Sequence, residues 1–311
     1  MFRYSKNDGF NPNLSNYFTE AGKDALGILA GLNSSTFNVA SLLTVDAPEF
    51  ARRVIKNRVP LTLIHALIDR IPGKDYNRPG ADPDAPVVFF RHGYWTGAAS
   101  MKGFGKTLGK DFGIDNHQYD YTDYLPDLAD RFLNKVEKVK AAGKEVHVIA
   151  HSKGALVALY AYQQKPELFD KIVTMAVPFQ GSEMADKYWW VTLPFPPYIS
   201  LREFSPNNLI LSKMKRKGLP ENAQIINFYT DTDEFIKPFE NAKLPEQDNV
   251  NNILIPEIKH NAFLYDAVVQ QFARFFLNGF PLDDRLFDRI DFQLHGKETA
   301  RLEEIAEANW V

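Results

Sequence analysis

The sequence predicts an α/β fold, with a mainly parallel central sheet and helices on both of its faces. Two observations lead to this prediction. From residue 86 onward, short apolar runs alternate with amphipathic stretches, and no internal repeat interrupts the alternation. Short apolar runs separated by helical patterns are typical of parallel strands, which are covered on both faces. In such sheets the chemistry lies beyond the carboxyl ends of the strands.

The composition is that of a globular protein. Of the 311 residues, 45% are hydrophobic and 24% are charged, which excludes a disordered or collagen-like chain. The net charge of −3 gives no reason to expect a nucleic-acid partner. The absence of cysteine excludes disulfides, thiolate metal sites and a cysteine nucleophile, and we expect neither a metal nor another cofactor.

The chain divides into three regions. Residues 1–84 read as a helical N-terminal extension, because apolar residues between positions 50 and 68 recur at helical spacing and a turn-rich segment, 71–84, follows them. Residues 85–280 hold the α/β core. The tail, 281–311, is expected to pack on the core or on an oligomer partner.

The core elements follow one another in alternation. Strands are expected where apolar residues cluster, and helices where apolar residues fall on one face. The expected strands are 86–90, 117–121 (the weakest), 145–150, 171–177, 224–229 and 251–255, and the expected helices are 98–110, 126–141, 155–161 and 262–277.

One insertion, about 182–222, is too aromatic for an ordinary connection and too rich in proline for a strand. Exposed in water, such a patch would promote aggregation, so it should pack over something apolar. We interpret it as a cap over an apolar binding site, with a packed surface excursion as the alternative. Its aromatic residues include Trp189, Trp190, Phe195 and Tyr198.

A nucleophile motif follows the strand 145–150. The segment Ala150-His151-Ser152-Lys153-Gly154 joins that strand to a helix, and this is the context of a nucleophile elbow. Small residues two positions before and after the serine, here Ala150 and Gly154, keep the neighbouring backbone from clashing in the tight turn. Ser152 is therefore the expected nucleophile.

With this motif in place, residues 86–278 resemble the α/β-hydrolase superfamily, more narrowly its bacterial lipase-like serine esterases. The resemblance rests on Arg91-His92-Gly93-Tyr94, on the elbow, on Pro178 to Asp186, and on the segment from Asp233 to His260. It implies an α/β-hydrolase fold and a catalytic triad in the chain order Ser, Asp or Glu, His.

The base and the acid are expected downstream of Ser152. Only His260 and His295 follow the serine, and His260 lies between a strand and a helix, as the base does in this superfamily, whereas His295 lies in the charged tail. For the acid, Asp233 fits the superfamily pattern best, and Asp231 is the alternative. A serine needs such a base, and the base needs such an acid to orient it.

Two backbone N–H groups should form the oxyanion hole. Lys153 N–H directly follows the nucleophile, and Tyr94 N–H lies in the loop that resembles the His-Gly-x motif of the superfamily. His92 is expected to brace this loop and not to act as the base. Asp120, Asp123, Asp127 and Asp130 are expected to be solvated carboxylates, not a calcium site.

The predicted activity is hydrolysis of a carboxylic ester through an acyl-Ser152 intermediate, and the aromatic cap favours a lipid or lipid-like substrate. Two alternatives remain open, namely acyl transfer by the same triad and a catalytically inactive binding protein. The cap also predicts transient contact with a lipid surface. No signal peptide or membrane-spanning run is evident, so we expect a cytoplasmic protein, with non-classical secretion as the alternative.

Overall fold

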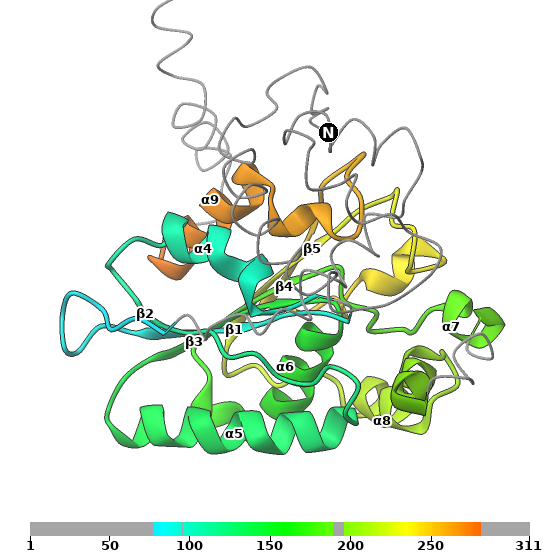
Figure 1. Ribbon diagram of the computed structural model, residues 1–311, viewed down its shortest axis with the longest axis horizontal. Helices are drawn as coiled ribbons and strands as arrows, with labels where there is room; N and C mark the ends of the chain where they lie inside the picture. Colours follow the sequence, from blue (N-terminus) through cyan, green and yellow to red (C-terminus); the bar gives the residue numbers. More distant parts are fainter. Residues whose placement is uncertain (1–76, 95, 189–195, 281–311) are drawn as a thin grey trace, which may run out of the picture.

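The computed structural model describes residues 77–94, 96–188 and 196–280 (Figure 1). Its centre is a six-stranded sheet in the order β2-β1-β3-β4-β5-β6, and every neighbouring pair is parallel. The mainly parallel sheet predicted from the sequence is therefore confirmed. The strands are β1 (Val87–Arg91), β2 (Gly113–Asp115), β3 (Val146–His151), β4 (Lys171–Met175), β5 (Gln224–Tyr229) and β6 (Val250–Leu254).

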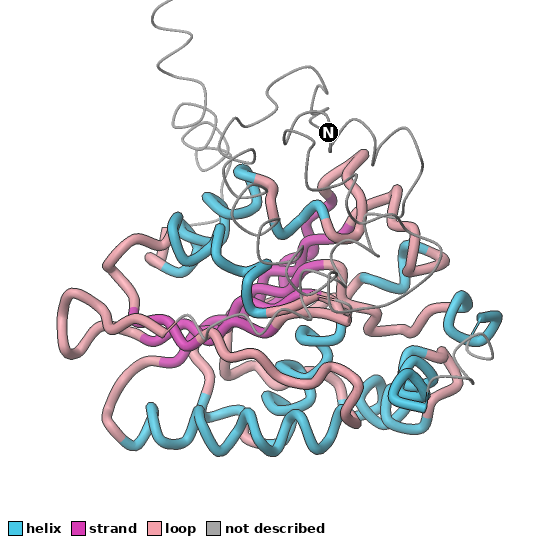
Figure 2. Tube along the Cα trace, viewed as in Figure 1, coloured by secondary structure: helices cyan, strands magenta, loops and turns pink. Residues whose placement is uncertain are grey.

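Helices cover both faces of the sheet, as Figures 1 and 2 show. On one face lie α5 (Leu125–Ala141), α6 (Lys153–Gln164) and α8 (Leu209–Lys217), and on the other lie α4 (Lys102–Thr107) and α9 (Ala267–Leu277). The short helix α7 (Glu183–Tyr188) and the 3₁₀ helix η5 (Pro196–Phe204) belong to the region predicted as a cap.

The sheet separates two hydrophobic cores. All six residues of β3 are buried, and four of them, Val146 and Val148 to Ala150, are apolar, as expected for a strand covered on both faces. Alternate side chains of the strands enter the core beneath α5 and α6 or the core beneath α4 and α9. On α5, Leu128, Phe132 and Val136 are buried at the helical spacing that the sequence indicated.

The strand expected at residues 117–121 is wrong. The second strand lies earlier, at Gly113–Asp115, where Val87–Phe89 of β1 pair with it. The following residues use their side chains to hold other loops. Gln118 Oε1 accepts the N–H of Ala98 at 2.7 Å, and the Tyr119 ring stacks on the His92 ring with centroids 3.9 Å apart. The segment is therefore a brace with no strand partner within the described ranges.

Two expected helices are shorter than their apolar patterns. The segment 98–110 is a 3₁₀ helix, Ala98–Met101, followed by α4. The segment 262–277 begins with a 3₁₀ turn, Ala262–Leu264, and α9 starts only after Asp266, whose carboxylate accepts the N–H of Val269 as an N-cap.

The described residues begin at 77, within the segment predicted to link the N-terminal extension to the core, and end at 280. Arg78 forms an isolated backbone bridge with Ile114, so the last residues of the predicted linker already contact the sheet. The proposed N-terminal helices before residue 77 and the tail after residue 280 lie outside the described residues. No helix in the described ranges has the length and apolar character needed to cross a bilayer.

Candidate active site

Ser152 occupies a strained turn between β3 and α6. Its backbone has φ 51° and ψ −120°, in the positive-φ region that non-glycine residues rarely adopt. The turn is held by a hydrogen bond from Ser152 N–H to Met175 O at 2.9 Å. A Cβ at Gly154 would lie 2.3 Å from the carbonyl oxygen of Arg91, so the tight packing of α6 on β1 requires glycine there.

The structure brings Ser152, His260 and Asp233 into one hydrogen-bonded chain. His260 Nε2 lies 3.0 Å from Ser152 Oγ, and His260 Nδ1 lies 2.8 Å from Asp233 Oδ2. All three residues are buried, and they come from the ends of β3, β5 and β6. This is the arrangement of nucleophile, base and orienting acid.

The surroundings of Asp233 keep its carboxylate ionised. Burial alone would raise its pKa, but the charge and hydrogen bond of His260, together with two backbone N–H groups, outweigh burial and lower the pKa below its ordinary value. Those N–H groups belong to Phe235 and Ile236, and both donate to Asp233 Oδ1 at 2.8 Å. The second oxygen, Oδ2, is thereby directed at His260.

Asp231, the alternative acid, lies elsewhere. Its Oδ1 accepts the backbone N–H of Glu257 at 3.0 Å, and Glu257 has a positive φ of 62°. Geometry therefore places Asp233, and not Asp231, against the imidazole of His260. The catalytic roles of these residues stay predictions. The other histidine considered as a base, His295, lies outside the described residues.

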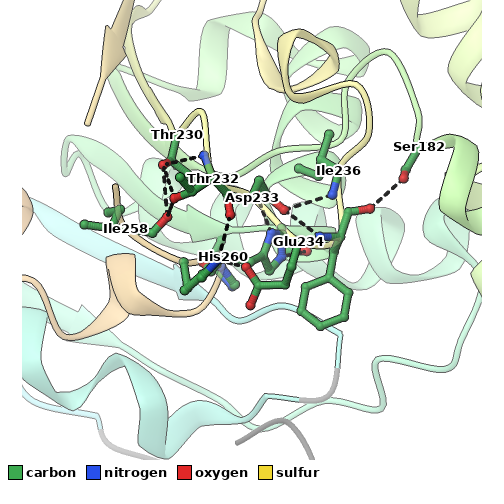
Figure 3. Close-up of polar contacts among 12 residues, drawn as sticks. Ser182, Thr230, Thr232, Asp233, Glu234, Ile236, Ile258 and His260 are labelled. Carbon is green, nitrogen blue, oxygen red and sulfur yellow. Dashed lines mark hydrogen bonds and ion pairs between the residues drawn. The ribbon is translucent and has the colours of Figure 1, made fainter. Parts of the chain in front are cut away.

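Other side chains that follow β5 bind the loop that carries His260 (Figure 3). The hydroxyls of Thr230 and Thr232 both donate to Ile258 O, at 2.9 and 2.6 Å. The Glu234 carboxylate accepts the backbone N–H of His260 at 3.0 Å. These contacts were not predicted from the sequence. A signal for them is present, because five consecutive residues with side-chain oxygen atoms, 230–234, directly follow a strand and can hydrogen-bond to a neighbouring loop.

His151 is a further neighbour of the base. Its Nε2 donates to the carbonyl oxygen of His260 at 3.0 Å, and the two rings are 4.9 Å apart between centroids. Burial, reinforced by the adjacent His260, lowers the pKa of His151 to about 3, so its ring is neutral at ordinary pH. Sequence reasoning treated this position only as a spacer within the elbow.

Of the two residues predicted to form the oxyanion hole, Lys153 lies within the nucleophile elbow and Tyr94 lies in the loop after β1. Lys153 is the first residue of α6, and the first N–H groups of a helix have no acceptor within the helix. Tyr94 follows Gly93, and a Cβ on Gly93 would lie 2.9 Å from the Cβ of Ser152. The loop before Tyr94 therefore approaches the serine so closely that only glycine fits. The oxyanion role of both residues stays a prediction.

His92 braces this loop. Its Nδ1 donates to Gly93 O at 3.1 Å, and Thr96 Oγ1 binds both the N–H and the carbonyl of Gly93. Burial lowers the pKa of His92 to about 3. Its side chain is thus neutral and engaged in holding the loop, in keeping with the expectation that it is not the base.

The side chain of Lys153 was not considered in the sequence analysis. It is fully buried, and its Nζ lies 2.7 Å from Glu203 Oε2 and 2.7 Å from the carbonyl oxygen of Asp123. Burial lowers the pKa of Lys153, while Glu203 acts in the opposite direction. Glu203 belongs to η5, so this ion pair joins the predicted cap region to the nucleophile elbow.

The aromatic residues predicted for the cap lie mostly outside the described ranges. Trp189, Trp190 and Phe195 lie outside the described residues, and only the backbone of Tyr198 is described, within η5. No cluster of three or more histidine, aspartate or glutamate side chains able to hold a metal ion occurs in the part of the chain that the structure describes. The acidic cluster Asp120 to Asp130 belongs to that part.

A family comparison agrees with this geometry. The model of a family described as serine aminopeptidase, S33, matches residues 87–253, which is more than half of the chain. The chain belongs to this family. The predicted α/β-hydrolase superfamily, its fold and the hydrolase class are therefore confirmed. A search among curated proteins finds no match.

Solved structures share the fold of this family member at low sequence identity. The mature lipase BlEst2 of Bacillus licheniformis aligns with TM-score 0.54 and 14% identity over 67% of this chain and 98% of the lipase. Lipase B of Aspergillus fumigatus aligns with TM-score 0.56 and 17% identity over 70% of this chain but 58% of that lipase. A structure from work on the metagenome-derived lipolytic enzymes LipS and LipT aligns with TM-score 0.52 and 13% identity, over 67% of this chain and 98% of that chain.

Proposed function

We propose that this protein hydrolyses carboxylic esters through an acyl-Ser152 intermediate. The observation that carries the proposal is the chain of contacts from Ser152 Oγ through the His260 imidazole to Asp233, with separations of 3.0 and 2.8 Å. A serine hydroxyl is a weak nucleophile by itself and becomes reactive when a neutral imidazole can accept its proton. The strained, positive-φ elbow presents that hydroxyl at the end of β3.

Acylation follows from this arrangement. Ser152 Oγ attacks the ester carbonyl carbon while its proton passes to His260 Nε2, and the resulting imidazolium is stabilised by the Asp233 carboxylate. The negative charge that forms on the carbonyl oxygen would be bound by the N–H groups of Lys153 and Tyr94. Collapse of the tetrahedral intermediate breaks the bond to the alkoxy group, which leaves as the alcohol after taking the proton from His260.

Deacylation repeats these steps with water. His260, now neutral, accepts a proton from a water molecule as that water attacks the acyl carbon of the ester on Ser152. The proton returns to Ser152 Oγ as the carboxylic acid departs. If another alcohol takes the place of water, the same residues carry out acyl transfer.

We further propose that the ester is lipid-like. The support is the aromatic composition of the segment 188–198, together with the names of the fold relatives, which are lipases and lipolytic enzymes. Each CH₂ group moved from water into an apolar site contributes about 0.8 kcal/mol, so an apolar cap would favour longer acyl chains.

Labelling with a fluorophosphonate tests the activity directly. We expect the reagent to modify Ser152 in the wild-type protein, as located by mass spectrometry, and to leave Ser152→Ala unmodified. A label on another residue would overturn the assignment of the nucleophile. Chromogenic esters of increasing acyl length then test the lipid-like substrate, and product analysis with water and alcohol acceptors distinguishes hydrolysis from acyl transfer.

The family description favours a second candidate, cleavage of an N-terminal aminoacyl amide bond. The same triad can attack an amide, since the acyl-serine chemistry is shared. Aminoacyl anilides and esters should therefore be compared at equal concentration. We expect faster turnover of the esters, and preferential cleavage of an anilide with a free α-amino group would favour the aminopeptidase instead.

A further inference from the structure

The backbone of His260 is held at both of its polar groups. Its N–H donates to Glu234 Oε2, and its carbonyl oxygen accepts from His151 Nε2, each at 3.0 Å. Glu234 directly follows Asp233 in the chain, and His151 directly precedes Ser152. The imidazole of His260 thus contacts Asp233 and Ser152, while the chain neighbours of these two residues bind the main chain of His260.

We propose that His151 and Glu234 are positioning residues that fix the His260 imidazole between Ser152 and Asp233. The inference rests on the proposed function, because it explains how the proposed base is held. It concerns two residues outside the triad, and each acts through the backbone of His260 and does not touch the reacting atoms.

The loop that carries His260 needs such support. Residues 255–261 form neither helix nor strand, and Glu257 and Lys259 are exposed on either side of Ile258. Among the described residues, the N–H and the carbonyl of His260 form no hydrogen bond with another main-chain group. Regular secondary structure therefore does not determine the direction of its Cα–Cβ bond. The two side chains that bind its peptide groups do.

The buried His151 ring forms one hydrogen bond through its side chain, to His260 O, and this bond explains why a polar ring occupies the position. Its Nδ1 is buried and has no hydrogen-bond partner within the described ranges, and leaving such an atom unpaired costs about 1–3 kcal/mol. An aliphatic side chain would fill the space without that cost. The imidazole instead adopts the tautomer with the proton on Nε2, which donates to His260 O.

The position of His151 is itself restrained. A Cβ on Gly93 would lie 2.7 Å from His151 Nδ1, so the ring packs directly against the glycine of the oxyanion loop. The ring is therefore confined between Gly93 on one side and His260 on the other. A base displaced by about 1 Å can lose 10²-fold in rate, so this restraint has a measurable consequence.

Substitution of His151 separates positioning from packing. His151→Leu removes the donor, whereas His151→Gln keeps an N–H donor at about the same distance from Cα. His147→Leu is the matched control, because His147 is buried on the same strand and has no contact with the triad that the structure records. The measurements are kcat and KM for a short chromogenic ester and the rate of fluorophosphonate labelling.

We expect His151→Leu to lower kcat and the labelling rate roughly 10- to 100-fold with KM nearly unchanged, since only the position of the base changes. His151→Gln should recover most of the loss, and His147→Leu should behave as the wild type. Equal kcat in His151→Leu and the wild type, or no recovery in a folded His151→Gln protein, would overturn the role of His151.

Glu234 provides an independent pair of variants, because its side chain is exposed and its replacement should not prevent folding. Glu234→Gln keeps an oxygen that accepts His260 N–H, whereas Glu234→Ala removes it. We expect kcat to fall in the alanine variant and to stay near the wild-type value in the glutamine variant. Equal kcat in the alanine variant and the wild type would overturn the role of Glu234.

A proton NMR measurement distinguishes failure of this inference from failure of the proposed function. The Nδ1–H proton of His260, bound to Asp233, should resonate far downfield in the wild type and in His151→Gln and weaken or vanish in His151→Leu. That outcome supports positioning even if the wild type is not labelled, in which case only the proposed activity fails. An unchanged signal in His151→Leu would contradict the inference.

Discussion

The ammonium group of Lys153 and the carboxylate of Glu203 form a buried ion pair at 2.7 Å, and Lys153 directly follows the proposed nucleophile in the chain. Lys153 is fully buried and Glu203 is 4% exposed. The other carboxylate oxygen of Glu203 accepts the N–H of Leu125 at 2.7 Å, at the start of α5. One glutamate therefore joins η5, α5 and the N-terminus of α6, and it places negative charge where helix N-termini favour it.

Removal of one partner of this pair should be strongly destabilising. Glu203→Ala leaves the Lys153 charge buried without its carboxylate, and we expect the free energy of unfolding to fall by about 3–5 kcal/mol. The double variant Lys153→Met, Glu203→Leu should recover part of this loss, because no uncompensated charge is then buried. Urea unfolding measures both values. A loss in Glu203→Ala that the double variant does not reduce would contradict this account.

The two aspartates of the acid loop should differ in their effect on turnover. Asp233→Asn removes the carboxylate that orients His260, and we expect kcat to fall roughly 10³-fold or more. Asp231→Asn keeps an oxygen that can accept Glu257 N–H and should cost far less. Steady-state kinetics on a short ester gives both values. The reverse ranking would transfer the acid role to Asp231.

Activity should require neutral His260. We expect kcat/KM to fall as the pH is lowered from about 8 to about 5, because a protonated imidazole cannot accept the proton of Ser152 Oγ. A pH–rate profile on an ester that is stable over this range tests the expectation. An unchanged acid limb in a still active His260→Ala variant would indicate another base, with His295 the first to examine.

Stability should fall on the acid side for a different reason. Burial lowers the pKa of His92 and His151 to about 3 and, with the charge of Lys171, that of His147 to about 4. The unfolded chain therefore binds more protons than the folded protein below about pH 6.5, so stability is lost as the pH falls from there toward 4. Each histidine contributes at most about 1.4 kcal/mol per pH unit.

Urea unfolding at pH 7, 6 and 5 measures this dependence, with three histidines giving a slope of up to about 4 kcal/mol per pH unit near pH 5. His147→Leu should reduce the slope by about a third, because one of the three titrations is removed. A stability that does not change between pH 7 and pH 5 would show that these side chains do not titrate on unfolding as expected.

The aromatic segment should determine the preference for long acyl chains. Replacement of Trp189 and Trp190 by alanine should lower kcat/KM for octanoate esters more than for acetate esters, because apolar contacts add about 0.8 kcal/mol per CH₂ group. Equal losses for the two esters would indicate that the tryptophans only pack, and the lipid-like substrate would then lose its main support.

The sequence was sufficient for the elements whose signal is local. Buried strands such as β1 read as apolar runs, and the elbow has a compact motif between a strand and a helix. Asp233 and His260 could be predicted as partners of Ser152 because the resemblance to the α/β-hydrolase superfamily implies the order of the triad along the chain. The strand expected at 117–121 is absent because Gln118 and Tyr119 contact other loops with their side chains, which periodicity does not reveal.

Contacts between distant parts of the chain were beyond such reasoning. Lys153 and Glu203 are separated by 50 residues, and each by itself resembles an ordinary surface charge. His151 reads as a spacer until the fold brings His260, 109 residues later, against its ring. Only the packing of the sheet ends makes these pairs visible.

The hydrogen bonds between segments 230–234 and 257–260 have a consequence for chimeric proteins. All five residues of the first segment bind the second through their side chains, although some twenty residues separate the two along the chain. A recombination junction between Phe235 and Pro256 would join halves from different parents and mismatch the whole set at once. Exchange of both segments together would preserve these five contacts, so the two loops should be transferred between proteins as one unit.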